Sequence, residues 1–386
     1  MLQRANKIAG QITEWRRDFH KHPELGFQET RTSGKIAETL AALGYRVRTG
    51  VGRTGVVADL GEGHPMVAIR ADIDALPIQD AKNVPYASQV PGVMHACGHD
   101  AHTAMAMGVA TLLKEETFPG GVRFLFQPAE ETDDDEGLSG ASRMIEDGAM
   151  TGVDYALALH VSSDIPVGDI GVRAGPASAG VDTFYAAVIG TGGHGASPHA
   201  LIDPIYLSTF VTQAIYGIIS RRISPMESGV VSIGSIQGGS KDNVIPDQVK
   251  LVGTIRYNEP AVQEQLHLEI ERALQIAQAM GGDYDLKIVT GYPPVINDPD
   301  LIDLIHNAAA DLLGSNHVVE AVRRMGAEDF SFFQRRAPGA MFRLGARIEG
   351  DERLHHNPYF DIDEHCLPIG VAVMAETALR LLRRGA

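Results

Sequence analysis

The stretch MHACGHDAH, residues 94–102, concentrates side chains that bind transition metals. It places Cys97 and three histidines within nine positions, although the whole chain has only two cysteines. Thiolate and imidazole are preferred ligands of zinc and of similar divalent metals. Cys97 and His99 stand two residues apart in a turn that contains Gly98, so both side chains can reach one ion or a close pair of ions. The stretch therefore predicts a metal site that ligands from elsewhere in the chain must complete.

Three apolar runs, typical of buried strands, end in or just before polar side chains that can do chemistry. Asp72 and Asp74 come from MVAIRAD and from the IDA that follows it. Glu130 and Glu131 end the run VRFLFQPAEE, and His160 lies in YALALHV. Helical stretches separate the runs, and strands that alternate with helices are typical of an α/β sheet with covered faces. Ligands of such sheets bind at the carboxyl ends of strands. We therefore expect these side chains to gather at one edge of a sheet.

The middle of the chain follows a different order of elements. From 181 to 290 the patterns predict strand, helix, strand, strand, helix and strand, which is the split-βαβ or ferredoxin-like motif. Stretches with Gly and Pro, RAGPASAG and TGYPPVIND, flank it as expected of hinges between domains. The sequence thus predicts a discontinuous α/β domain of residues 1–180 and 291–386, with a ferredoxin-like domain of residues 181–290 inserted into it.

The overall composition narrows the classes of function. The chain has 386 residues, 44% of them apolar, which allows two domains with a sizeable core. A net charge of −16 argues against nucleic-acid binding, and no apolar run reaches membrane-spanning length. Two cysteines cannot form a disulfide framework, and the N-terminal stretch lacks the apolar core of a signal peptide. We therefore expect a cytoplasmic protein that binds neither nucleic acid nor a membrane.

Motifs of other enzyme classes are absent or interrupted. The stretch GTGGHG satisfies G-x-G-x-x-G, but Pro198 and Pro204 interrupt the helix that a dinucleotide site needs there. Neither G-x-S-x-G nor H-E-x-x-H occurs, so the serine-esterase and zincin interpretations lack support.

The chain resembles the zinc-dependent aminoacylase and carboxypeptidase superfamily. Within it, the chain is similar to the amidohydrolase branch of hippurate hydrolases, bacterial N-acyl-amino-acid amidohydrolases and plant auxin-conjugate hydrolases. The matching stretches run in family order from residue 16 to 364: RRDFHKHPELGFQE, IRADIDALP, MHACGHDAH, FLFQPAEE, ALHV, GTGGHGASPH, DNVIPDQVKLVGTIR, MGAEDFSFF and HHNPYFDIDE. The resemblance implies a metallopeptidase-type catalytic domain with a mixed sheet and flanking helices. It also implies that the inserted domain is a lid and a dimerisation domain.

The resemblance further implies a site for two divalent metal ions, which zinc, manganese, cobalt or nickel could fill. The implied ligands are Cys97, His99, Glu131, His160 and His356. The family pattern of His, one residue and Pro favours His356, with His355 as the alternative. Cys97 occupies the place of a bridging carboxylate in relatives, so we expect it to bridge as a thiolate. Glu130 would be the general base, and Asp74 would orient the ligands without binding metal.

The inserted domain is implied to supply substrate contacts. His194 would polarise the amide carbonyl across a dimer, and the alternative is a structural loop histidine. Asn243 and Arg256 would hold the substrate's carboxylate, a task that an arginine fork suits, although a surface arginine is the alternative. The remaining candidates are predicted to have structural or supporting roles: His20, His22, His95, His102, His199 and the buried Cys366.

These features predict a metal-dependent amidohydrolase that releases a carboxylate and a free amino acid from an N-acyl or N-aroyl amino acid. A metal lowers the pKa of water and polarises the carbonyl, and a carboxylate beside it transfers the proton to the leaving amine. The alternatives are a dipeptidase or an N-acetyl-diamino-acid deacetylase with the same chemistry, and a non-catalytic relative that binds metal or ligand. Because the base and the ligands are all present, an enzyme is favoured. We expect a homodimer or a dimer of dimers.

Overall fold

The computed structural model describes residues 1–351 and 353–384, which divide into two compact units. The first unit contains Met1–Gly175, Ile296–Val322 and Asp329–Ala386, and the second contains Pro176–Val295 and Arg323–Glu328. The boundaries predicted at 180 and 291 fall a few residues inside the second unit. The sequence patterns gave no sign that residues 323–328 return to the second unit.

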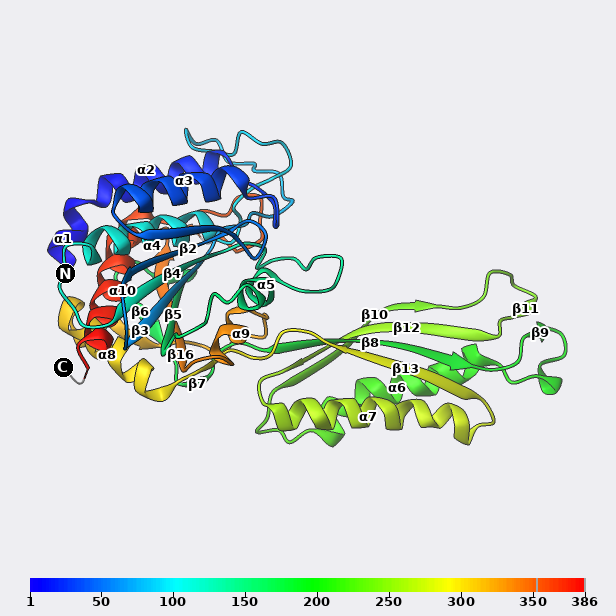
Figure 1. The fold of residues 1–386 in the computed structure, drawn as a ribbon. Helices are drawn as coiled ribbons and strands as arrows, with labels where there is room; N and C mark the ends of the chain where they lie inside the picture. Colours follow the sequence, from blue (N-terminus) through cyan, green and yellow to red (C-terminus); the bar gives the residue numbers. More distant parts are fainter. Residues whose placement is uncertain (352, 385–386) are drawn as a thin grey trace. The chain divides into compact units, whose positions relative to one another are not determined.

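An eight-stranded mixed sheet forms the centre of the first unit (Figure 1). In spatial order its strands are β1 (Arg46–Val51), β2 (Gly55–Gly61), β4 (Gly121–Gln127), β3 (Met66–Asp72), β5 (Tyr155–Pro166), β16 (Gly339–Arg347), β6 (Ile170–Val172) and β15 (Val318–Glu320). β4, β3, β5 and β16 run parallel to one another, while β2 pairs antiparallel with β4 and β6 pairs antiparallel with β16. The predicted α/β fold with a mixed sheet is therefore confirmed.

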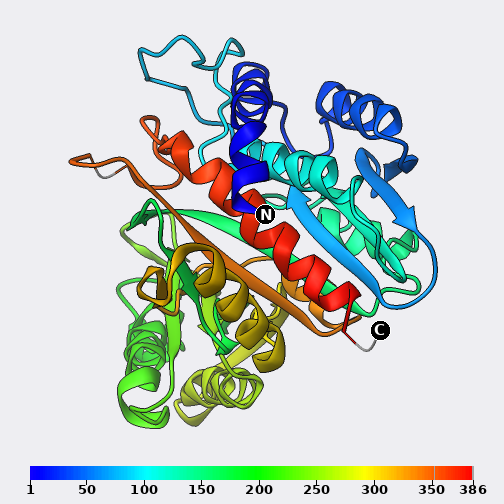
Figure 2. The same ribbon diagram turned by 90° about the vertical axis from the view of Figure 1, so that its left-hand side faces the viewer.

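Helices cover both faces of this sheet. They are α1 (Leu2–Lys7), α2 (Ala9–Lys21), α3 (Thr30–Ala42), α4 (His99–Leu113), α5 (Gly140–Glu146), α8 (Pro299–Leu313), α9 (Phe330–Gln334) and α10 (Leu367–Leu382), with short 3₁₀ turns at Ser315–His317 and Glu364–Cys366. α4 and α10 pack against each other and against β3 and β5, as Figures 1 and 2 show. α5 and α9 contact each other on the opposite side. The central strands are thus buried on both faces, which explains their continuous apolar runs.

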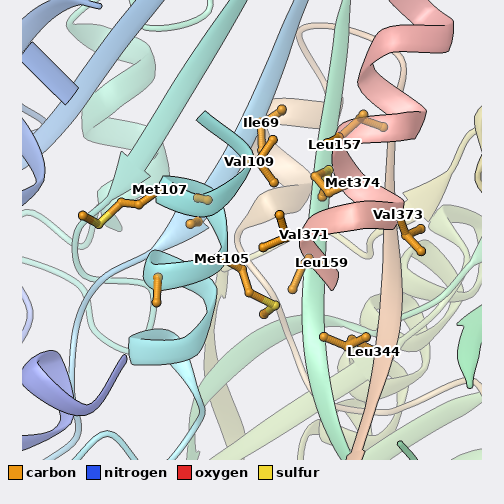
Figure 3. Packing of buried hydrophobic residues seen from close by; sticks show 14 of the residues in the cluster. Ile69, Met105, Met107, Val109, Leu157, Leu159, Leu344, Val371, Val373 and Met374 are labelled. Carbon is orange, nitrogen blue, oxygen red and sulfur yellow. The ribbon is translucent and has the colours of Figure 1, made fainter. Parts of the chain in front are cut away.

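The core between α4, α10 and the central strands is closely packed (Figure 3). Gly370 lets α10 approach closely, because a Cβ there would lie 2.5 Å from the sulfur of Met105 and 2.7 Å from Leu344. Leu159 and Val371 fill the same contact. Burying an aliphatic side chain of this size contributes about 1.5–3 kcal/mol, so this core supplies the rigidity on which the edge of the sheet depends.

The C-terminal segment Glu364–Leu382 is long and apolar enough to cross a membrane by length and composition alone. However, 78% of its apolar window is buried inside the protein, where α10 packs against α1, α2, α4 and α8. Its place in the core accounts for its composition, and residues 1–351 and 353–384 contain no other helix of that length and hydropathy.

A four-stranded antiparallel sheet forms the second unit. Its elements are β8 (Gly180–Ile189), α6 (Pro204–Arg222), β10 (Gly229–Gln237), β12 (Gln248–Tyr257), α7 (Pro260–Ala279) and β13 (Asp283–Thr290), with the spatial strand order β10, β12, β8, β13. α6 and α7 pack together on one face, so alternate residues of β12 are buried. Shorter elements of this unit are β9 (Gly193–His194), paired with β11 (Val244–Ile245), and a 3₁₀ turn at Pro198–Ala200. A further pair, β7 (Gly175–Pro176) with β14 (Ile296–Asn297), stands where the chain passes from one unit to the other.

Candidate metal centre

Three parallel strands bring the candidate ligands to one edge of the first unit's sheet. β3 ends at Asp72, two residues before Asp74, and β4 ends just before the turn Pro128–Glu131. β5 carries His160 near the same edge. Because β4, β3 and β5 pair in parallel, their carboxyl ends meet. The turn before α4 supplies Cys97, and α4 itself begins at His99.

The ligand atoms lie close enough to share one or two ions. The atoms of Cys97, His99 and His160 all lie within 4.8 Å of one another, and so do those of Cys97, Glu131 and His356. Cys97 belongs to both groups, which is the position that a bridging thiolate needs. The Cys97 Sγ atom lies 3.5 Å from His160 Nε2. His356 Nε2 lies 3.0 Å from Glu131 Oε1.

Hydrogen bonds fix the ring orientation of two of these histidines. His99 Nδ1 donates to the backbone oxygen and to Oδ1 of Asp74, both at 3.0 Å. His160 Nδ1 donates to the backbone oxygen of Val161 at 2.7 Å. Each ring therefore directs its Nε2 lone pair into the cluster, as metal-binding histidines do. His99 Nε2 is buried without a hydrogen-bond partner in the described part of the chain, so the donor set fits a bound cation.

Asp74 orients two candidate ligands at once. Its Oδ1 atom accepts the His99 Nδ1–H, and its Oδ2 atom accepts the backbone N–H of Glu131 at 3.0 Å. The side chain is almost completely buried. Both oxygens are used for hydrogen bonds to ligand residues, which is the geometry expected of a group that supports the site without binding metal.

The pKa values of the cluster depend on burial and on the nearby charges. Burial, followed by the charge of Glu131, raises the pKa of the Cys97 thiol. A hydrogen bond to Cys97, followed by one to Glu131, raises the pKa of His356 to about 10. Burial alone would lower the pKa of His99, but Asp72 and Asp74 outweigh it and raise that pKa well above its usual value. Binding a cation here has to displace protons from these groups, so metal affinity should rise with pH.

Both members of the pair at 355 and 356 lie near Cys97. His355 Nδ1 lies 3.8 Å from Cys97 Sγ, and its ring packs against His160 and Phe360 with centroid distances of 5.3 and 4.7 Å. His356 has a φ of +60° and directs its Nε2 at Glu131. Because only His356 joins a group of potential ligands, it stays the predicted ligand.

The other histidines of the first unit have different surroundings. His102 Nδ1 donates to Asp72 at 2.6 Å, and its Nε2 accepts the Val161 N–H at 3.0 Å, so neither nitrogen is available to a metal. His22 Nδ1 donates to the Asp18 backbone oxygen at 2.8 Å. His20 Nδ1 lies 2.7 Å from Asp100 Oδ2, inside a buried ionic network.

That ionic network was not predicted. Arg16 is completely buried and donates to Asp100 at 2.8 Å, to Asp361 at 2.7 Å and to Glu364 at 3.1 Å. Lys82 donates to the Phe360 backbone oxygen at 2.6 Å. The network ties the segment after His356 to the start of α4. Its acidic members and Arg16 stand in stretches that match the family, but their residue types do not show that they pair with one another, and the three-dimensional structure reveals that pairing.

The second unit holds the remaining predicted site residues at two opposite ends of its sheet (Figure 1). His194 is exposed on β9, and Asn243 is close to it because the Gly195 N–H donates to the Asn243 backbone oxygen at 2.9 Å. Arg256 pairs in register with Val181, at the other end of β12. It is half-buried, burial lowers its pKa, and its guanidinium has no hydrogen bond or ion pair within residues 1–351 and 353–384. His199 lies exposed in the 3₁₀ turn near His194.

Comparisons with known proteins support one family. Residues 68–380 match the sequence model of Peptidase family M20/M25/M40. The chain is 40% identical over 393 residues to thermostable carboxypeptidase 2 of Saccharolobus solfataricus, covering 98% of each protein. It is 39% identical over 377 residues to the N-acetylcysteine deacetylase of Bacillus subtilis, covering 96% of this chain and 97% of the relative. The crystal structure of the Bacillus subtilis YXEP protein, a dinuclear metal-binding peptidase of the M20 family, superposes with a TM-score of 0.86 at 35% identity, covering 98% and 99% of the two chains.

Replacing Cys97 by alanine should lower metal content and thermal stability together, because metal binding is linked to folding. Metal analysis of the purified protein and thermal denaturation measure both. The matched control is Cys366→Ala, because Cys366 is the other buried cysteine and lies outside the candidate ligand groups. In the same assay His356→Ala should lose metal and His355→Ala should keep it. The reverse result would make His355 the ligand.

His95 should make the metal-free protein sensitive to acid. Both of its ring nitrogens are buried without a hydrogen-bond partner in the described residues, and burial lowers its pKa to about 4. Its pKa in the unfolded chain is about 6.5, so the unfolded state takes up the proton first as the pH falls. The contribution of His95 to stability should therefore be constant above pH 6.5 and should fall between pH 6.5 and 4 by up to about 3 kcal/mol.

Urea denaturation with chelator at several pH values measures this loss. The His95→Leu protein should lose less stability over that range than the wild type, whereas His365→Leu, at an exposed position, should behave as the wild type does. Equal acid sensitivity of His95→Leu and wild type would contradict the prediction.

Proposed function

Because the chain belongs to Peptidase family M20/M25/M40, we propose that it hydrolyses the amide bond of N-acyl or N-aroyl amino acids. The products are a carboxylate and a free amino acid. The observation that carries this proposal is the pair Glu130 and Glu131, which the end of β4 presents to His99. Similarity to an N-acetylcysteine deacetylase supports an N-acyl amino acid as the substrate. Similarity to a carboxypeptidase favours a dipeptide as the second candidate.

Two divalent ions complete the proposed site. Cys97, His99, Glu131, His160 and His356 would hold them, and zinc, manganese, cobalt and nickel all suit these donors. When bound, such ions lower the pKa of the attacking water and polarise the scissile carbonyl.

Glu130 and Glu131 have different roles in this proposal. Glu131 is committed to the ligand cluster, since it pairs with His356 and its N–H donates to Asp74. Glu130 Oε2 lies 4.0 Å from His99 Nε2, beside the cluster. Glu130 takes the proton from the attacking water and returns it to the leaving amine, which is the role of a general base that becomes a general acid.

The second unit supplies the substrate contacts in this proposal. Arg256 is suited to an anionic group, because its half-buried guanidinium has no acidic partner in the described part of the chain. His194 would polarise the carbonyl oxygen, and Asn243 would assist binding. Gln248 and Arg256 stand eight positions apart along β12, which is about 27 Å. A small substrate cannot span that distance, so Arg256 and His194 act on one substrate only if they come from two copies of the chain.

Exposed apolar side chains on the second unit support a proposed dimer. α6 exposes Tyr206 and Tyr216, each 55% exposed, and part of Phe210. β10 is an edge strand with unpaired backbone groups, and it exposes Ile236. Apolar side chains beside an open strand edge favour pairing with an identical surface about a two-fold axis. We therefore propose a homodimer through the second unit. Cytoplasmic residence is also proposed, because both cysteines are buried free thiols.

Glu130→Ala should keep its metal and lose on the order of 10²–10⁴ in rate, because it removes a general base. The assay is hydrolysis of a panel of N-acetyl, N-benzoyl and indole-acyl amino acids and of dipeptides, each with zinc, manganese, cobalt or nickel. The matched control is Glu136→Ala, an exposed acid of the following loop, which should be fully active. Activity near wild type in Glu130→Ala would remove Glu130 from the base role. Faster cleavage of dipeptides would establish the second candidate function.

Mixed dimers of Glu130→Ala and His194→Ala should recover activity if His194 acts on the partner subunit. Each mixed dimer then has one intact site and one doubly damaged site, so random mixing restores roughly a quarter of wild-type activity. A parallel mixture of Glu130→Ala with Arg256→Ala tests whether Arg256, at the opposite end of the sheet, acts on the site of the partner subunit instead. No recovery in either mixture, with mixed dimers demonstrated by mass, would contradict action across the dimer.

A further inference from the structure

The turn Pro128–Glu131, which presents both glutamates, has a strained backbone. Ala129 adopts a φ of +42°, in the left-handed region that residues with a Cβ rarely occupy. Ala129 is also completely buried. Backbone strain of this kind persists only where the surrounding structure enforces it, and it concentrates at functional sites.

Two carboxylates and a close packing contact hold this turn. The Ala129 N–H donates to Glu29 Oε1 at 2.9 Å, and the Glu131 N–H donates to Asp74 Oδ2 at 3.0 Å. The Ala129 oxygen accepts the Gly140 N–H at 3.0 Å. A Cβ at Gly140 would lie 1.7 Å from the Pro128 oxygen, so only glycine permits this approach.

Glu29 is an unusual residue for such a position. It is completely buried and makes no ion pair with a basic side chain in the part of the chain that the structure describes. Its second oxygen, Oε2, accepts the Thr54 Oγ1–H at 2.5 Å. Burial, followed by the charge of Asp74, raises the pKa of Glu29 to about 7. Burying a carboxylate without an ion pair costs free energy, so the groups that Glu29 contacts indicate its role, and one of them is the Ala129 N–H.

We propose that Glu29 is a positioning residue for the two glutamates, because its carboxylate holds the Ala129 N–H and thereby the left-handed turn that directs Glu130 at the metal cluster. This inference rests on the proposed role of Glu130 as general base. Glu29 and Asp74 accept hydrogen bonds from the N–H groups of Ala129 and Glu131, two alternate residues of this turn. Thr54 fixes Glu29 by a hydrogen bond to its other oxygen. Displacement of a catalytic group by about 1 Å costs on the order of 100-fold in rate, so loss of the Glu29 contact should reduce kcat.

The decisive variants are Glu29→Ala and Glu29→Gln, measured with saturating metal on the substrate that the wild type hydrolyses best. Glu29→Ala should lose roughly 10- to 100-fold in kcat, with KM and metal content near wild type. Hydrogen exchange of peptides covering the turn should rise in that variant. Glu29→Gln keeps an Oε1 acceptor for the Ala129 N–H, so it should restore both kcat and slow exchange.

A second substitution tests the role of backbone strain. Glycine adopts a left-handed conformation without a steric penalty. In the Ala129→Gly background, therefore, Glu29→Ala should cost much less in kcat than it does in the wild type. Residues that act through one backbone element show this non-additivity, and full additivity would overturn the proposal.

The control is Asp154→Ala, which removes a carboxylate that accepts the Met66 N–H at the opposite end of β3. It should change stability and leave kcat unchanged. If Glu29→Ala does not fold, Thr54→Val loosens Glu29 instead and should lower kcat and raise exchange at the turn to a smaller extent. Wild-type kcat in a folded Glu29→Ala protein, or a loss that added metal reverses, would overturn the inference. Activity in Glu130→Ala would instead defeat the base role, while exchange at the turn would still report on Glu29.

Discussion

Burial of charged groups at one edge of the sheet is the constraint on which the rest of the structure depends. Moving a carboxylate out of water costs several kcal/mol unless hydrogen bonds or opposite charges compensate for it. Asp72 meets this requirement through Arg70 at 2.6 Å and His102 at 2.6 Å. Asp74 meets it through His99 and the Glu131 N–H. The partners of Asp74 belong to two candidate ligands, so the contacts that compensate its buried charge also orient the metal cluster.

The strands that bring the candidate ligands to this edge were predictable from the sequence, whereas the short strands elsewhere in the same sheet were not. β3, β4 and β5 are continuous apolar runs because helices cover both faces, and such runs are visible in one dimension. The family and the hydrolase class were inferred from the same motifs and are confirmed by the family match. By contrast, β6 and β15 have three residues each. Pairing with distant strands defines them, and no local pattern of that length can reveal it.

The candidate site shows the same division between local and long-range information. Cys97, His99 and the two glutamates stand in short motifs whose residue types already indicate chemistry. Arg16 and Glu29 stand at the two ends of the matching stretch RRDFHKHPELGFQE, but their residue types do not indicate a buried role, because a charged residue in a helix or at its start is normally solvated. Their burial follows from contacts with residues more than 80 positions away, such as Asp100 and Ala129. Residues that support the site are therefore harder to predict from the sequence than the candidate ligands themselves.

Cys97 links the proposed metal chemistry to the electrostatics of the site. Burial and the charge of Glu131 raise the pKa of the thiol, so the protein alone does not favour a thiolate there. A divalent cation reverses that preference, because a coordinated thiol gives up its proton. His356 shares a group of ligand atoms with Cys97 and Glu131, so its proton has to leave with the thiol proton. In the proposed centre the charge of the cation favours the thiolate that binds it, whereas burial without the cation disfavours the thiolate, which is the reactive form of cysteine.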